Sequence, residues 1–152
     1  MIRCLALTSV LVLGHCTRSA APRPPEPIPG WATVQATGDC APWDGPAVAI
    51  YFTKDSATLD SISAPYLRVS LWKELDQLAG HEWKWPGDSE VGAASLCQTE
   101  DSCQAATAGV VQLDPMGAEP RVAGSLRLEF GSEPPIEGRF VAVWRQRTGP
   151  CR

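Results

Sequence analysis

The chain has little histidine, no long hydrophobic run and no strong excess of one charge, and each shortage excludes a class of function. Two histidines occur among 152 residues, and only His81 lies beyond the first 16 positions. No CxxC pair is present either, so we expect no zinc site. The apolar stretch Cys4 to Leu13 has about ten residues. It is too short to cross a bilayer as a helix, which needs ~20.

The charged residues indicate neither nucleic-acid binding nor catalysis. The formal net charge is −4, and the C-terminal arginines alternate with glutamates, so no basic face for nucleic acid is expected. No serine lies in a Gly-x-Ser-x-Gly elbow that could pair with His81. The acids at 88–90 and 100–101 lie beside turn residues, where acids are normally solvated, and lack the spacing of a calcium loop. We expect no catalytic residue, no metal and no cofactor.

The first sixteen residues have the layout of an export signal: Arg3, the apolar stretch, then small residues. Leu13-Gly14-His15-Cys16 resembles the lipobox of bacterial lipoproteins, although His15 stands where a small residue is usual. We expect residues 1–16 to be a lipoprotein-type signal and Cys16 to carry lipid that anchors the protein to a membrane of the cell envelope. The alternative is cleavage after Ser19, which gives a freely secreted or periplasmic protein.

Residues 17–30 are expected to form a tether. Closely spaced prolines in Ala20–Gly30 favour extended polyproline II, which would span roughly 30 Å. The folded domain is then expected to cover residues 31–152.

The cysteines predict two disulfides. Of six cysteines, Cys4 leaves with the signal and Cys16 leaves or takes lipid, so four remain in an oxidising compartment. Four cysteines allow three pairings. Nearness in sequence favours Cys97–Cys103, which leaves Cys40–Cys151.

Alternating apolar and polar residues, separated by turn residues, indicate an all-β domain. The expected strands are residues 31–37, 47–53, 66–72, 82–85, 91–96, 106–113, 122–130 and 139–145. A short helix is expected within Lys73–Gly80. About seven or eight short strands favour an antiparallel β-sandwich, with a small barrel as the alternative. A Cys40–Cys151 bridge suits the sandwich.

Several segments together carry a resemblance. They are Cys40-Ala41-Pro42, Gly45-Pro46-Ala47-Val48, the Cys97 and Cys103 pair, and Gly138-Arg139-Phe140-Val141-Ala142-Val143-Trp144 before a terminal cysteine. This arrangement resembles small exported bacterial proteins of unknown function, which are often lipoproteins. The resemblance implies a β-sandwich and carries over no catalytic residue.

The tryptophans offer the best functional lead. Trp83 and Trp85 lie two apart, so on a strand their rings share a face. An exposed pair would form a platform for a sugar ring or a partner's side chain, whereas a buried pair would belong to the core. We expect a non-enzymatic, envelope-displayed protein with a binding or structural role, its partner a glycan or an envelope protein. The alternative is a carbohydrate-recognition module using Trp83 and Trp85. A small secreted hydrolase is disfavoured by the missing motifs.

The lipid and the disulfides can be checked together by the intact mass of the native protein. We expect a chain that begins at Cys16, carries acyl groups and lacks two hydrogens for each of two bridges. Globomycin should make the precursor accumulate. An unmodified chain beginning after Ser19, with no accumulation, would contradict the anchor.

Overall fold

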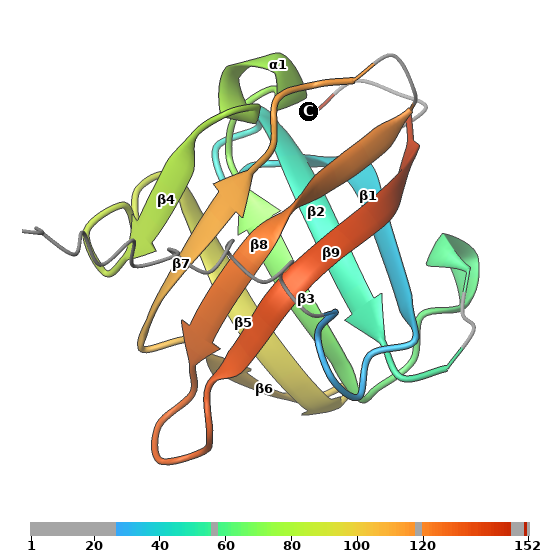
Figure 1. Cartoon of the computed structure of the whole chain (residues 1–152), viewed down its shortest axis with the longest axis vertical. Coiled ribbons are helices and arrows are strands. Elements are labelled where there is room, and N and C mark those ends of the chain that lie inside the picture. Colours follow the sequence, from blue (N-terminus) through green and yellow to red (C-terminus); the bar gives the residue numbers. More distant parts are fainter. Residues whose placement is uncertain (1–26, 56–57, 118–119, 147–150, 152) are drawn as a thin grey trace, which may run out of the picture.

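The computed structural model describes residues 27–55, 58–117, 120–146 and 151. The expected signal, Cys16 and most of the tether lie outside these residues. Nine strands form one mixed, strongly curled sheet (Figure 1). They are β1 (Thr33–Cys40), β2 (Pro46–Thr53), β3 (Tyr66–Leu71), β4 (Glu82–Trp85), β5 (Gly92–Thr99), β6 (Ser102–Ala105), β7 (Ala108–Leu113), β8 (Arg121–Glu129) and β9 (Ile136–Arg145).

The strand order across the sheet is β4-β7-β8-β9-β1-β2-β3-β5-β6. Every pairing between neighbours is antiparallel except that of β1 with β9, which is parallel. Helical structure in the described chain amounts to the single turn α1 (Leu75–Leu78) and the short 3-10 segment η1 (Leu59–Ser61). The chain leaves α1 through Gly80, whose φ of 78° is the left-handed conformation that commonly ends a helix.

The all-β class is confirmed, but the antiparallel sandwich of seven or eight strands is not. One continuous sheet curls around the core in place of two facing sheets, and it is mixed because β1 and β9 run parallel. The small barrel is partly consistent with this shape. Alternation of apolar and polar residues shows which side chains face a core. The pattern is the same whether the far side of that core is a second sheet or another part of the same curled sheet.

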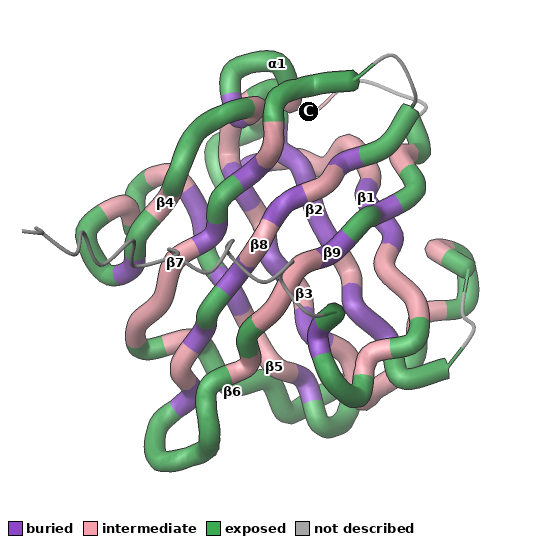
Figure 2. Tube along the Cα trace, in the orientation of Figure 1, coloured by how far each residue is buried: buried purple, intermediate pink, exposed green. Residues whose placement is uncertain are grey.

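The core fills the inside of the curl. Val48, Ile50 and Phe52 point inward from β2 and are almost fully buried, and the same holds for alternate residues of β3 and β8 (Figure 2). Phe52 meets Phe140 of β9 edge-on, with ring centroids 5.3 Å apart. Because β1 separates these strands in the sheet, the contact reaches across the inside of the curve and helps to hold it.

Glycines permit the close approach of neighbouring strands. A Cβ on Gly124 of β8 would collide with the carbonyl oxygen of Gln112 on β7, and one on Gly109 of β7 with that of Arg127 on β8. Side chains at these two positions would push β7 and β8 apart. Glycine in a strand interior often marks such a place.

The two ends of the sheet are joined without strand pairing. The indole Nε1 of Trp85 on β4 donates to the carbonyl oxygen of Gly92 on β5 at 2.9 Å. Where β6 passes into β7, the amide of Ala106 donates to the Ala94 oxygen at 2.8 Å, and that of Thr107 to the Glu129 oxygen at 2.8 Å. These bonds link β4 to β5, and β5 through the β6–β7 connection to β8.

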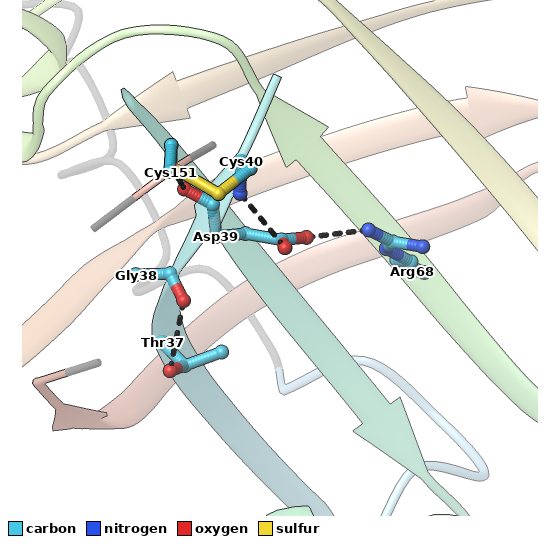
Figure 3. Close-up of a disulfide and its surroundings, with 6 residues drawn as sticks. All are labelled: Thr37, Gly38, Asp39, Cys40, Arg68 and Cys151. Carbon is cyan, nitrogen blue, oxygen red and sulfur yellow. Dashed lines mark hydrogen bonds and ion pairs between the residues drawn. A yellow bond between two sulfur atoms is a disulfide. The ribbon is translucent and has the colours of Figure 1, made fainter. Parts of the chain in front are cut away.

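Both expected disulfides are confirmed. Cys40–Cys151 ties the end of β1 to the C-terminal region (Figure 3). Cys97–Cys103 crosses the β5–β6 hairpin, where the two cysteines are paired in register. Strand β6 was not expected, because Ser102–Ala105 is exposed at every position and has no apolar alternation.

The end of the segment expected to be tether contacts the folded domain. Pro27 forms an isolated parallel bridge with Arg139, and Ile28 is 5% exposed and belongs to the core. A single apolar side chain among prolines gives no periodic signal, so composition assigned this segment to the tether. Ile28 therefore packs into the core from within the segment expected to be tether.

Replacing Ile28 tests this contact. We expect Ile28→Ala to lower the free energy of unfolding by about 2–5 kcal/mol, because it leaves a cavity in the core. Pro29→Ala, at an exposed neighbouring position, is the matched control. Chemical denaturation followed by tryptophan fluorescence would measure both. Equal stabilities for the two variants would return residues 27–30 to the tether.

Candidate functional site

Of the two readings of Trp83 and Trp85, an exposed platform or part of the core, the structure is consistent with the core. Both residues lie on β4, but Trp85 is only 8% exposed and uses its indole N–H to bond Gly92. Trp83 is partly buried and packs against the core. β4 is an end strand of the curled sheet, and Trp85 links it to β5. The two indoles therefore fill the space where β4 approaches β5. Spacing placed the two rings on one face but did not reveal that this face is covered.

Two other side chains, Lys73 and His81, lie close to the Trp83 ring. The ammonium Nζ of Lys73 lies over its ring, 5.2 Å from the centroid, and the His81 ring lies 6.1 Å away. A cation over an indole face is a favourable contact. His81 is exposed and has no hydrogen bond to a serine or carboxylate of the described chain. It therefore forms no catalytic triad with such a partner.

The exposed tryptophan is Trp43, in the turn between β1 and β2. The residue is 59% exposed, and its ring meets that of Trp72 edge-on, with centroids 5.2 Å apart and an angle of 78° between planes. Trp72 is half-buried at the end of β3. We call this pair the tryptophan corner. Trp43 carried no sequence signal that set it apart from the other five tryptophans.

A pocket of about 600 Å³ opens on the outer face of β1, β2 and β3. This volume lies within the range of small-molecule sites. We call it the tyrosine pocket. Its lining residues come from six separate segments: Thr37, Tyr51, Thr58, Leu59, Asp60, Ile62, Tyr66, Glu100, Arg145 and Gln146.

Strand register places the residues of the tyrosine pocket. Thr37 of β1 pairs with Arg145 through the parallel β1–β9 contact, and Thr53 of β2 pairs with Tyr66 of β3. Tyr51 and Tyr66 lie with ring centroids 6.1 Å apart. The η1 segment forms another wall, and the Thr58 and Ser61 hydroxyls, 2.9 Å apart, join its two ends.

An ion pair supports Tyr51 from the side. The Arg68 guanidinium lies over the Tyr51 ring at 5.6 Å and donates to the Asp39 carboxylate at 2.5 Å. The other Asp39 oxygen accepts the Cys40 amide at 2.8 Å, beside the Cys40–Cys151 disulfide (Figure 3). Tyr51 is therefore held by Arg68, and Arg68 is held by a residue next to a covalent bridge.

The charges of the tyrosine pocket are not paired with one another. Arg145, Asp60 and Glu100 line the same hollow, yet no ion pair joins any of them to another described residue. Elsewhere in the described chain, Arg68, Arg127 and Arg139 each bond a carboxylate. Charges of both signs are thus available to a bound molecule in this pocket.

Burial raises the pKa of Tyr51 above its ordinary value of 10.0. The loss of hydration is the largest cause; Arg68 acts against it, and Asp39 and Tyr66 act with it. The phenol is therefore neutral at physiological pH. Such a phenol can donate or accept a hydrogen bond and offers an apolar ring face.

A second hollow of about 300 Å³ lies beside α1 and is mainly apolar, with Leu75, Met116 and Val141 among its lining residues. In the described part of the chain, no group of three or more histidine, cysteine or acidic side chains is placed to hold a metal ion. No helix of that part is long and apolar enough to cross a membrane.

The chain matches no known family model, and no significant similarity to a curated protein or to a solved structure was found. The resemblance to small exported proteins therefore stays a prediction. The functional argument rests on the geometry of the tyrosine pocket and the tryptophan corner.

Alkaline titration tests the environment of Tyr51. The chain has two tyrosines, so absorbance at 295 nm should resolve a component that ionises above pH 10, and Tyr51→Phe should remove it. A raised folded pKa adds stability that is fully present below the unfolded pKa of about 10 and is lost as pH rises through the folded value. Loss of the late component in Tyr66→Phe, but not in Tyr51→Phe, would contradict this assignment.

Proposed function

We propose that the protein is a non-enzymatic binding protein of the cell envelope and that the tyrosine pocket is its ligand site. The observation that carries the proposal is a hollow of about 600 Å³ lined by two tyrosines and by charges of both signs without mutual ion pairs. Export and anchoring rest on the signal pattern and Cys16. The two disulfides support an oxidising location.

The lining favours a small zwitterionic ligand, such as a free amino acid or a short peptide. Arg145 offers a guanidinium that suits a carboxylate. Asp60 and Glu100 offer carboxylates that suit an ammonium group, and the tyrosines offer apolar ring surface with hydroxyls. A ligand with both charges would satisfy all of these groups together.

The chemistry of the lining favours binding over catalysis. The described residues around the pocket include no histidine or cysteine, and the pKa of Tyr51 is raised, which makes its phenol a weaker nucleophile near neutral pH. The two hydroxyls at Thr58 and Ser61 bond each other and the backbone of η1. Support for a hydrolase is therefore weak in this pocket.

Binding can be tested with the twenty common amino acids and with di- and tripeptides, measured by isothermal titration calorimetry. We expect at least one of them to bind with a Kd below about 1 mM. Arg145→Ala should weaken that binding at least tenfold, because a charge-assisted contact to the ligand contributes about 1.5–3 kcal/mol. Glu100→Gln and Asp60→Asn should weaken it as well.

Arg127→Ala is the matched control, because Arg127 is an exposed arginine that bonds Glu137 and lies outside the pocket lining. It should leave the Kd unchanged. Either the absence of binding across this panel or equal affinities in the two arginine variants would refute the proposed ligand site.

A further inference from the structure

The tryptophan corner is an apolar surface that the fold itself does not require. Trp43 is the most exposed large hydrophobic residue of the described chain, at 59%, and the core contains neither Trp43 nor Trp72. Most of the indole that could be buried is left in water. A single exposed apolar residue is common at protein surfaces, so its significance depends on how firmly it is held and what surrounds it.

The turn holds Trp43 in one place. The amide of Ala41 donates to the Gly45 oxygen at 2.9 Å, and that of Asp44 to the Ala41 oxygen at 3.0 Å. Asp44 has a φ of 64°, which is uncommon for a residue with a side chain. The turn leaves β1 at Cys40, which is bonded to Cys151. Hydrogen bonds within the turn and a disulfide at its base thus fix the backbone.

The indole itself is also fixed. A Cβ added to Gly45 would lie 2.9 Å from the Nε1 atom of Trp43, so the indole lies against the backbone of Gly45. It also meets the Trp72 ring. A ring held in this way loses little conformational freedom when something binds to it, which favours affinity.

The two rings meet edge to face, with 78° between their planes, so a ring stacked on one indole would have the other indole beside it as a second wall. A pyranose ring has one face of C–H groups and an edge of hydroxyl groups. Its C–H face can stack on an indole, and the adjoining indole can contact its edge. The exposed residue Asp44 follows Trp43 directly and carries a carboxylate, a group that accepts hydrogen bonds from hydroxyls.

We propose that the tryptophan corner is a second binding site, which takes a pyranose unit of a surface polysaccharide. Trp43 is the stacking residue, Trp72 is the second wall and Asp44 is the hydroxyl acceptor. The proposal is independent of the tyrosine pocket, with which the corner shares no residue. It places carbohydrate recognition at Trp43 and Trp72, not at the covered Trp83 and Trp85.

Charge and surroundings favour a sugar over other occupants. A membrane interface attracts tryptophan, but anionic lipid repels a carboxylate beside the ring and a chain of net charge −4. A protein hot spot lies within a broad contact surface that excludes water around it. The turn around Trp43 instead consists of the exposed residues Pro42 and Asp44 and the half-buried Gly45.

Co-sedimentation with insoluble polysaccharides tests the site. The probes are peptidoglycan sacculi, chitin, cellulose and xylan, incubated with protein expressed from the full-length chain and carrying both disulfides. We expect at least one probe to retain the protein, and Trp43→Ala to weaken that retention at least tenfold. Trp43→Phe should keep part of it, because phenylalanine still offers a ring face.

Met116→Ala is the matched control, since Met116 is 52% exposed but has no ring; it should leave retention unchanged. Arg127→Ala, at an exposed position outside both sites, should also leave it unchanged. Thermal unfolding should match the wild type in every variant used.

Three results would overturn the proposal: no retention on any of the four polysaccharides, retention that Trp43→Ala leaves intact, or Trp43-dependent binding to phosphatidylglycerol vesicles with none to polysaccharide. The last result would identify Trp43 as a contact to the membrane.

Discussion

The structure depends on a single sheet that must enclose its own core. Among the described residues no second sheet covers the inner face, so the sheet curls, and Phe52 of β2 meets Phe140 of β9 across β1 on that face. The curl in turn needs strands that approach closely, which Gly109 and Gly124 permit. It also needs its ends held together, and the bond from Trp85 to Gly92 provides one link. The two tryptophans of β4 are therefore used by the fold, which is why they are not available as an exposed platform.

The same curl determines where the outer surface is hollow. Because β9 lies beside β1 in parallel, Arg145 near the end of the described chain comes next to Thr37. On the outer face of β2, Ala47 and Ala49 are as buried as the inward residues, so this face is covered near the Cys40–Cys151 bridge and opens only further along, at Tyr51. The disulfide, Asp39 and Arg68 form a chain of contacts that ends under the Tyr51 ring.

Sequence patterns predicted the local structure well and its long-range arrangement poorly. Alternation located β8 and β9, and the sequence Glu82-Trp83-Lys84-Trp85 located β4 with its observed bounds. Counting cysteines and choosing the nearer pair yielded both disulfides. Strand β6 was missed because its four residues are all exposed. The sandwich was favoured because a Cys40–Cys151 bridge suits packed sheets, and the single curled sheet was missed because strand order and parallel pairing have no periodic signature. Ile28 was missed for a similar reason, since one buried side chain among prolines makes no pattern.

The candidate sites could not be predicted because their residues come together only in the folded chain. In the sequence, the lining residues of the tyrosine pocket look like ordinary strand and turn residues. Strand register and the curl of the sheet place them around one hollow: Thr37, Tyr51, Tyr66, Glu100 and Arg145. Folding alone explains why Trp85 is buried and why Arg68 meets Asp39. The first contact gives the indole N–H a hydrogen-bond acceptor, and the second pairs a guanidinium with a carboxylate. Folding does not explain why a tryptophan whose turn and ring are held in place is 59% exposed, or why charges of both signs share a pocket without pairing with one another. Groups whose arrangement the folding free energy does not require are the ones for which a ligand is the simplest physical reason.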